Sequence, residues 1–135
     1  MTLMNDSEQL RAEFLRVIEN KFPEVFKKPF TLKSGEIRYS VYQTGATKRW
    51  MQVDCHPKHV AVAMDHRVGD ISTNDLVATG IPYGLQENRT GIILKKNDDA
   101  VNISFFLDYP YDFTQGKFVH FLKQHYESYL KRIRS

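Results

Sequence analysis

Hydrophobic residues recur with helical spacing near both ends of the chain. In the N-terminal part, apolar side chains follow a period close to 3.6 residues, with charged residues on the other side of the helical wheel. Asp6 and Ser7 are favourable helix caps, and Pro23 forces the preceding residue out of the helical conformation. The pattern predicts an amphipathic helix over residues 7–21.

The centre of the chain alternates between apolar and polar residues, as half-buried strands do. Three consecutive strands are predicted at about 37–42, 50–53 and 60–64, separated by turns at 44–46 and 55–58. We call residues 38–67 the meander. In its third strand, bulky residues alternate with Ala61 and Ala63, and we expect a helix to cover the alanine-bearing face closely.

The second half of the chain predicts a short helix, two more strands and a long helix. Asp70 or Ser72 can cap a helical turn around residues 75–77, which Gly80 and Pro82 terminate. Residues 92–94 and 101–107 read as strands of a hairpin, and residues 113–135 as an amphipathic helix with Asp112 as its cap. Residues 22–30 are interpreted as a packed connector, and Phe30 and Leu32 as the start of a further short strand.

These elements predict an α+β fold in one domain spanning residues 1–135. Their order is helix, three strands, short helix, two strands, helix. Short connections favour antiparallel pairing. We therefore expect a mostly antiparallel, curved sheet of about five strands, with the long N- and C-terminal helices packed on one face.

Composition favours a soluble protein of the cytoplasm. The 135 residues are 41% hydrophobic and 26% charged, which is ordinary for a globular domain. We expect no membrane segment, because no apolar run approaches the ~20 residues that a spanning helix needs. The N-terminus turns polar too early for a secretory signal, and a single Cys fits a reducing compartment.

Positive charge gathers in two parts of the chain. The meander contains five Lys and Arg against two Asp, and residues 113–135 contain five against one Glu, so these parts carry +3 and +4 while the whole chain carries +3. Such asymmetry can face a polyanion, but we favour the interpretation that it reflects a solvated helix face and a lysine-protected strand edge.

The turn of the meander contains residue types that bind zinc. Cys55, His56 and His59 lie close together in the sequence, and a tight turn can bring such ligands together. Their spacing matches no standard zinc module. A polar turn with exposed histidines is the interpretation that we favour, and we expect no metal or other cofactor.

The succession of an initial helix and a strand meander with carboxylates resembles the PD-(D/E)xK nucleases. The resemblance implies that Asp54 and Asp65 would hold a divalent ion beside the scissile phosphate. Arg67 would stand where that family has Lys, although a guanidinium cannot exchange a proton. We treat these three residues as candidates for an alternative function and otherwise assign no catalytic residue.

Two further groups are candidate binding residues. The cations Lys48, Arg49, Lys58 and Arg67 could contact nucleic acid, with Tyr39 or Tyr42 for stacking, whereas Trp50 is expected in the core. Tyr109 and Tyr111 flank a proline outside the core pattern, together with Tyr83 in another loop. Amphipathic aromatics of this kind are common at protein contact surfaces.

We therefore predict a non-catalytic protein that binds another protein, such as an adaptor, a chaperone-like protein or an immunity-type protein. We also consider a homodimer formed through an exposed sheet edge. The alternative is a nucleic-acid-binding protein or a divalent-metal-dependent nuclease that uses the meander.

Overall fold

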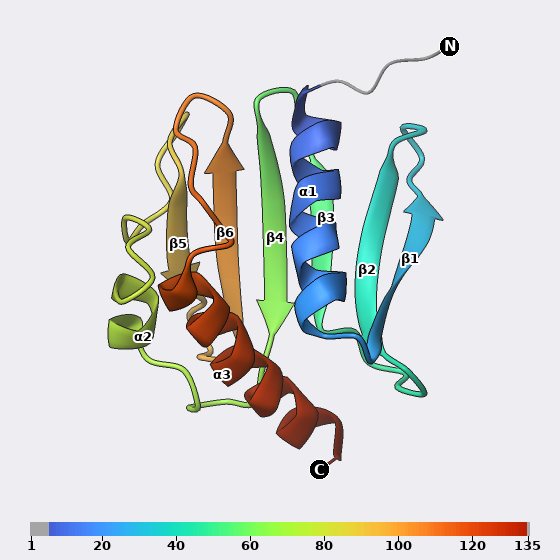
Figure 1. Ribbon diagram of the computed structural model, residues 1–135, viewed down its shortest axis with the longest axis vertical. Helices are drawn as coiled ribbons and strands as arrows, with labels where there is room; N and C mark the ends of the chain where they lie inside the picture. Colours follow the sequence, from blue (N-terminus) through green and yellow to red (C-terminus); the bar gives the residue numbers. More distant parts are fainter. Residues whose placement is uncertain (1–5, 135) are drawn as a thin grey trace.

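A computed structural model of the protein, which describes residues 6–134, shows the predicted α+β domain (Figure 1). The elements are, in chain order, α1 (Asp6–Lys21), β1 (Val25–Thr31), β2 (Ile37–Gln43), β3 (Met51–Cys55), β4 (His59–Asp65), α2 (Thr73–Val77), β5 (Gly91–Leu94), β6 (Ala100–Phe106) and α3 (Gly116–Arg134). Ser135, the predicted end of the last helix, lies outside the described residues, as do residues 1–5.

All six strands form one antiparallel sheet in the order β1-β2-β3-β4-β6-β5. The first four strands follow one another along the sheet. The β5–β6 hairpin then folds back, so that β6 pairs with β4 and β5 takes the edge.

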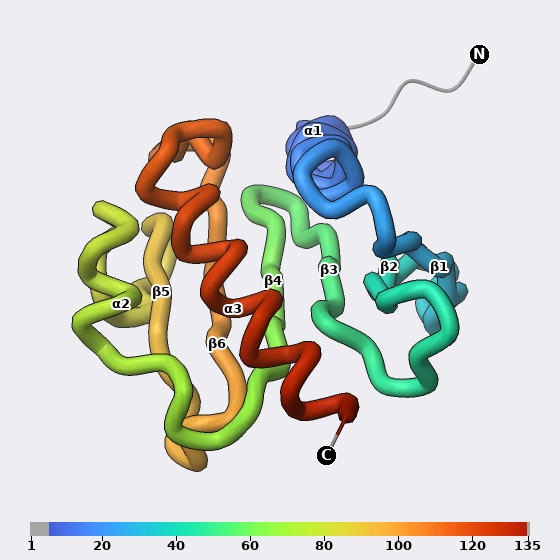
Figure 2. Tube along the Cα trace, turned by 60° about the horizontal axis from the view of Figure 1, so that its bottom comes forward, coloured from blue at the N-terminus to red at the C-terminus, as the bar shows by residue number. Residues whose placement is uncertain are grey.

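The helices cover only one face of this sheet. Figure 1 shows α1 in front of the middle strands and α3 crossing in front of β4 and β6, and in Figure 2 α1 is seen end-on with α3 still over β4 and β6. The covered face supplies the bulky residues of the meander, including Val53, Val62 and Met64, which are at most 2% exposed. The opposite face, which we call the open face, carries the residues of alternate register: Phe26, Lys28, Phe30, Arg38, Ser40, Tyr42, Gln52, Asp54, Ala61, Ala63, Asn102 and Ser104.

Aromatic rings fill the space between the helices and the covered face. Phe14 of α1 meets Phe105 of β6 and Phe118 of α3, with ring centroids 5.6 and 6.5 Å apart. Trp50, which is fully buried as predicted, lies 4.7 Å from Tyr126 of α3. Large rings let two helices and a sheet share one core, at roughly 150–250 Å² of buried surface per ring.

Three details of the sequence prediction are wrong. The sheet has six strands, because β1 is a complete edge strand where the sequence indicated a connector. Ala61 and Ala63 lie on the open face, not beneath a helix. Helix α3 begins at Gly116, because Asp112 accepts a hydrogen bond from the Thr114 backbone N–H and shapes a turn ahead of the helix.

The outer edges of the sheet differ in how they end. The backbone N–H of Leu32 donates to the Glu36 carbonyl, and that of Thr44 donates to the Glu24 carbonyl. In an antiparallel pair every second residue bonds to the neighbouring strand, so the even-numbered residues of β1 face β2 and the backbone of Pro29 faces outward. Proline has no N–H to present there. On β5, the segment 82–84 runs alongside and bonds to Ile92 at 3.1 and 2.8 Å, so this edge is covered.

A buried line of hydrogen bonds ties α3 to the sheet. The indole N–H of Trp50 donates to Nδ1 of His125 at 2.9 Å, so neutral His125 carries its proton on Nε2. That N–H donates to Nδ1 of His66 at 3.0 Å, and His66 in turn donates from Nε2 to the Asp98 carbonyl at 3.0 Å. Both imidazoles are fully buried and neutral in this arrangement.

Burial lowers the pKa of both histidines, that of His125 well below its usual value. Nearby carboxylates oppose the shift of His66 but are outweighed by desolvation. A proton added to either ring would place two N–H donors face to face. The line of bonds therefore requires that both rings stay uncharged.

We expect the protein to lose stability as the pH falls below about 6.5, the pKa of an unfolded histidine. Below that pH the unfolded chain binds protons that the folded chain does not, so the free energy of unfolding falls by up to ~1.4 kcal/mol per pH unit for each neutral histidine. Urea denaturation between pH 7 and 5 measures how the free energy of unfolding changes with pH. This range lies above the pH at which most carboxylates protonate.

A matched pair of variants isolates the contribution of the buried histidines. His125→Gln keeps an acceptor and a donor but removes one titrating group, so the slope should become shallower. His120→Gln changes an exposed histidine of the same helix and should keep the wild-type slope. A His125→Gln slope equal to that of wild type would contradict this account.

None of the helices within residues 6–134 has the length and apolar character needed to cross a membrane.

Candidate functional site

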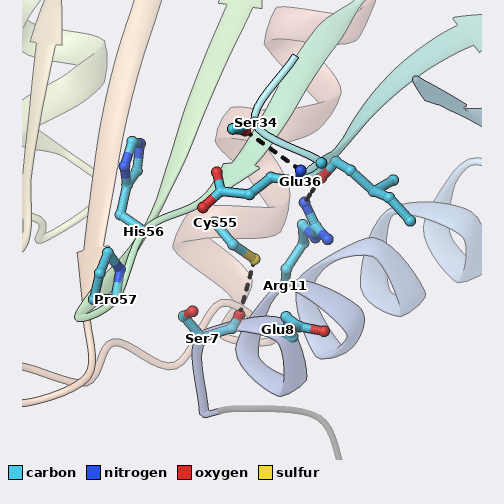
Figure 3. A pocket seen from close by; sticks show the side chains of 10 residues that line it. Ser7, Glu8, Arg11, Ser34, Glu36, Cys55, His56 and Pro57 are labelled. Carbon is cyan, nitrogen blue, oxygen red and sulfur yellow. Dashed lines mark hydrogen bonds between the residues drawn. The ribbon is translucent and has the colours of Figure 1, made fainter. Parts of the chain in front are cut away.

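The turn that contains Cys55 and His56 lines a polar pocket (Figure 3). This turn pocket has a volume of about 660 Å³ and lies where the start of α1 meets the β1–β2 and β3–β4 turns. Its lining residues are Ser7, Glu8, Arg11, Ser34, Gly35, Glu36, Ile37, Cys55, His56 and Pro57.

Arg11, at the base of the turn pocket, acts as a structural residue. It is 7% exposed and donates from Nη1 to the carbonyl oxygens of Ile37 at 2.5 Å and Val53 at 3.5 Å. Its guanidinium also lies 4.8 Å from the centre of the Tyr39 ring. Arg11 thereby connects α1 to β2 and β3. Its guanidinium serves the packing of these elements and is not a group that we assign to ligand binding.

The candidate zinc ligands are directed apart. The Cys55 thiol donates to the Ser7 carbonyl at 3.4 Å on the helix side, whereas the His56 and His59 rings stack on each other at 4.5 Å. His59 also stacks on Phe106 at 4.4 Å. Within residues 6–134 no three side chains of His, Cys, Asp or Glu are arranged to hold a metal ion.

We expect Cys55 to react slowly with a disulfide reagent in the folded protein. Burial raises the pKa of its thiol, and the thiolate is the reactive species. Absorbance after addition of an aromatic disulfide at pH 7 should show a rate well below that of the urea-unfolded chain. Equal rates in the two states would contradict a partly buried, protonated thiol.

Asp54, Asp65 and Arg67 do not converge on a common point. Asp54 is opposite Ala61, and Asp65 is four residues farther along β4, which separates their backbone positions by roughly 14 Å at ~3.4 Å per residue. Arg67 is directed at Asp70, to which it donates at 3.0 and 3.1 Å. A single divalent ion cannot be held by both carboxylates.

The four cations predicted to bind nucleic acid are also spread over the molecule. Lys48 lies in the β2–β3 loop, Lys58 in the β3–β4 turn at the other end of the sheet, and Arg67 beyond β4. Only Arg49 belongs to a cluster on the open face, where it binds Asp65 at 3.4 Å. The meander by itself therefore forms no continuous basic surface.

The loop tyrosines, by contrast, come together. Tyr109 and Tyr111, between β6 and α3, face Tyr83, which precedes β5, across a cleft of about 520 Å³. This tyrosine cleft is lined by Gly80, Pro82, Tyr83, Gly84, Gln86, Arg89, Thr90, Asp108, Tyr109, Pro110 and Tyr111. The guanidinium of Arg89 lies over the Tyr109 ring at 5.3 Å.

Hydrogen bonds hold the walls of the tyrosine cleft in place. The buried Thr90 hydroxyl donates to the Tyr109 carbonyl at 2.6 Å and accepts from the Phe106 N–H at 2.8 Å. The Tyr111 hydroxyl donates to the Thr79 carbonyl, and burial raises its pKa to about 12, so it stays protonated. Hydrogen bonds therefore position the walls of the cleft, while the rings of Tyr83 and Tyr109 stay exposed.

No match identifies this protein. No family model fits the chain, and no curated protein or solved structure resembles it significantly. The function must therefore be argued from the geometry of its own surfaces.

Sequence reasoning found the three tyrosines of the cleft but missed Arg89 and Thr90. Gly91 is a residue in the sequence pattern that indicates this site. A Cβ at this position would lie 2.0 Å from the Gly84 carbonyl oxygen, so only glycine lets the 82–84 segment approach β5. A glycine at the start of an apolar strand can indicate such an approach, although it does not name the partner segment.

We expect Thr90→Val to destabilise the protein by about 2–4 kcal/mol. The substitution preserves shape but leaves the Tyr109 carbonyl and the Phe106 N–H without their partner, and each unsatisfied buried group costs roughly 1–3 kcal/mol. Thr31→Val on the exposed edge strand is the control, expected within about 0.5 kcal/mol of wild type. Chemical denaturation measures both, and equal stabilities would show that Thr90 has no such role.

Proposed function

We propose that this protein is a non-catalytic binding domain that holds an extended segment of another protein in the tyrosine cleft. The observation that carries the proposal is the convergence of exposed tyrosine rings on walls positioned by hydrogen bonds. Tyr83 and Tyr109 are 46% and 45% exposed, and Leu85, two residues after Tyr83 in the sequence, is 43% exposed. An exposed aromatic cluster of this kind has no role in the core.

The composition of the cleft is that of a protein contact surface. Tyrosine and arginine are the residue types most enriched among those that dominate binding energy. Tyr109 and Arg89 already contact each other, so little side-chain freedom is lost when a partner covers them. Binding would then cover apolar ring surface and keep the phenol hydroxyls hydrogen-bonded.

The shape of the cleft favours an extended partner. Grooves lined with aromatic rings and prolines recognise preformed polyproline-type segments, which lose little entropy on binding. The volume of about 520 Å³ is that of a small-ligand pocket and accepts a short peptide, not a folded surface. We infer a proline-containing segment, with Arg89 and Asp108 available for its polar groups.

The wider biological assignment belongs to the same proposal. An adaptor, a chaperone-like protein or an immunity-type protein of the cytoplasm would use such a cleft. A homodimer through a sheet edge remains a prediction. The lack of an N–H at Pro29 and the covering of β5 by residues 82–84 make the edges poor places for it.

We expect Tyr109→Ala to weaken peptide binding by at least about tenfold, as loss of a dominant interface residue does. The probe is an array of short random and proline-rich peptides, followed by titration of the best binder by fluorescence anisotropy. NMR shifts on titration should centre on residues 83–90 and 108–111.

Tyr42→Ala, which removes a tyrosine from the open face, is the matched control and should leave peptide affinity unchanged. A peptide that binds Tyr109→Ala as tightly as wild type would overturn the assignment to this cleft. The absence of any peptide binder in the array would also count against the proposal.

A further inference from the structure

The open face contains another cleft at its β1 end. Its lining differs in chemistry from that of the tyrosine cleft. It has a volume of about 260 Å³ and is lined by Lys28, Pro29, Phe30, Arg38, Ser40, Tyr42 and Arg49. We call it the basic cleft. Its lining contains three cations and no carboxylate, although the chain as a whole carries only +3. The carboxylates that pair with Arg38 and Arg49, those of Asp54 and Asp65, lie outside this lining.

Aromatic rings stand exposed among these cations. Phe30 is 62% exposed, more than any other phenylalanine of the described chain, and Phe26 is 42% exposed. Phe26 stacks on Tyr42 with centroids 5.7 Å apart and ring planes at 22°. The Phe26–Tyr42 pair stabilises the pairing of β1 with β2, whereas the Phe30 ring is left mostly exposed and offers its face to a ligand.

The two arginines of the basic cleft are positioned in advance. Arg38 donates from Nε and Nη2 to both carboxylate oxygens of Asp54, at 2.9 and 3.1 Å. This leaves its Nη1 without a partner among the described residues. Arg49 is held by Asp65 at 3.4 Å and by the Gln52 side chain.

The two aspartates lie behind the guanidiniums and reduce the net charge of the face. In return they fix the direction of both arginine side chains, so less rotamer freedom is lost when a ligand binds. Lys28, on the neighbouring strand, lies opposite Ser40 in the sheet register and adds a third cation to the same face. The result is a short row of cations beside aromatic rings.

We propose that the basic cleft binds a single strand of nucleic acid. Phosphates would contact Lys28, Arg38 and Arg49, while bases would stack on Phe30 and on the Phe26–Tyr42 pair. Unpaired bases are required, because bases within a duplex do not present their faces to a protein. A cation-lined cleft without a carboxylate favours such a polyanion over a peptide.

The test is fluorescence anisotropy with labelled poly-dT and poly-U oligonucleotides over a salt series. Three phosphate contacts predict a slope of about −2 in the plot of log affinity against log salt, at roughly 0.7 per contact for single strands. Lys28→Ala should reduce that slope by about 0.7. Phe30→Ala should weaken binding by about 5-fold to 100-fold through lost stacking.

Controls separate this proposal from the peptide-binding proposal. Lys96→Ala removes the same charge from the β5–β6 turn, at the far end of the strand order, and should leave affinity and slope unchanged. Tyr109→Ala should retain oligonucleotide binding while it loses peptide binding, and Phe30→Ala should do the reverse. Thermal unfolding followed by circular dichroism verifies that each variant is folded.

Several results would overturn the proposal. These are the absence of binding at low salt, binding that Phe30→Ala does not weaken, and duplex DNA bound as tightly as the single strands. Tighter binding of poly-U or of poly-dT would each support it and would identify the kind of strand preferred.

Discussion

The buried line of hydrogen bonds from Trp50 through His125 and His66 to Asp98 joins four parts of the chain. It connects the entry to β3, the middle of α3, the residue after β4 and the β5–β6 turn. Only one face of the sheet is covered, so the helices must be held in a defined position on it. Hydrophobic contacts between aromatic rings are not directional and do not fix that position by themselves. The directional bonds of two neutral imidazoles remove that freedom, so the position of α3, and of the Tyr109 loop leading into it, depends on them.

Local patterns predicted much of the fold from the sequence. The helical periodicity of α1 and α3, the alternation in β2 and β4, and the cap of α2 are encoded by neighbouring residues. In α2, Ser72 and Asp75 form the reciprocal capping box. β1 escaped prediction because Pro29 and two lysines argue against a strand, and only its place at the sheet edge makes them acceptable.

The buried line of hydrogen bonds and the candidate binding surfaces were less predictable, for a physical reason. His66 and His125 are 59 residues apart, and Trp50 is 75 residues from His125, so no local pattern relates them. Likewise, the cations of the meander disperse because successive turns of an antiparallel meander lie at opposite ends of the sheet. The tyrosines could be predicted as a group because Tyr109 and Tyr111 are close together in one loop. Lys28 and Arg38 line the same cleft only because their strands pair, which no local pattern indicates.

The outward-facing backbone of Pro29 limits how this protein can assemble. Sheets grow between molecules when one edge donates and accepts main-chain hydrogen bonds along another, and a missing donor in the middle of the edge interrupts that template. Because residues 82–84 already occupy the other edge, neither side offers an uninterrupted ladder for an incoming strand. Addition of strands between molecules, including the unlimited addition that forms fibrils, is therefore disfavoured.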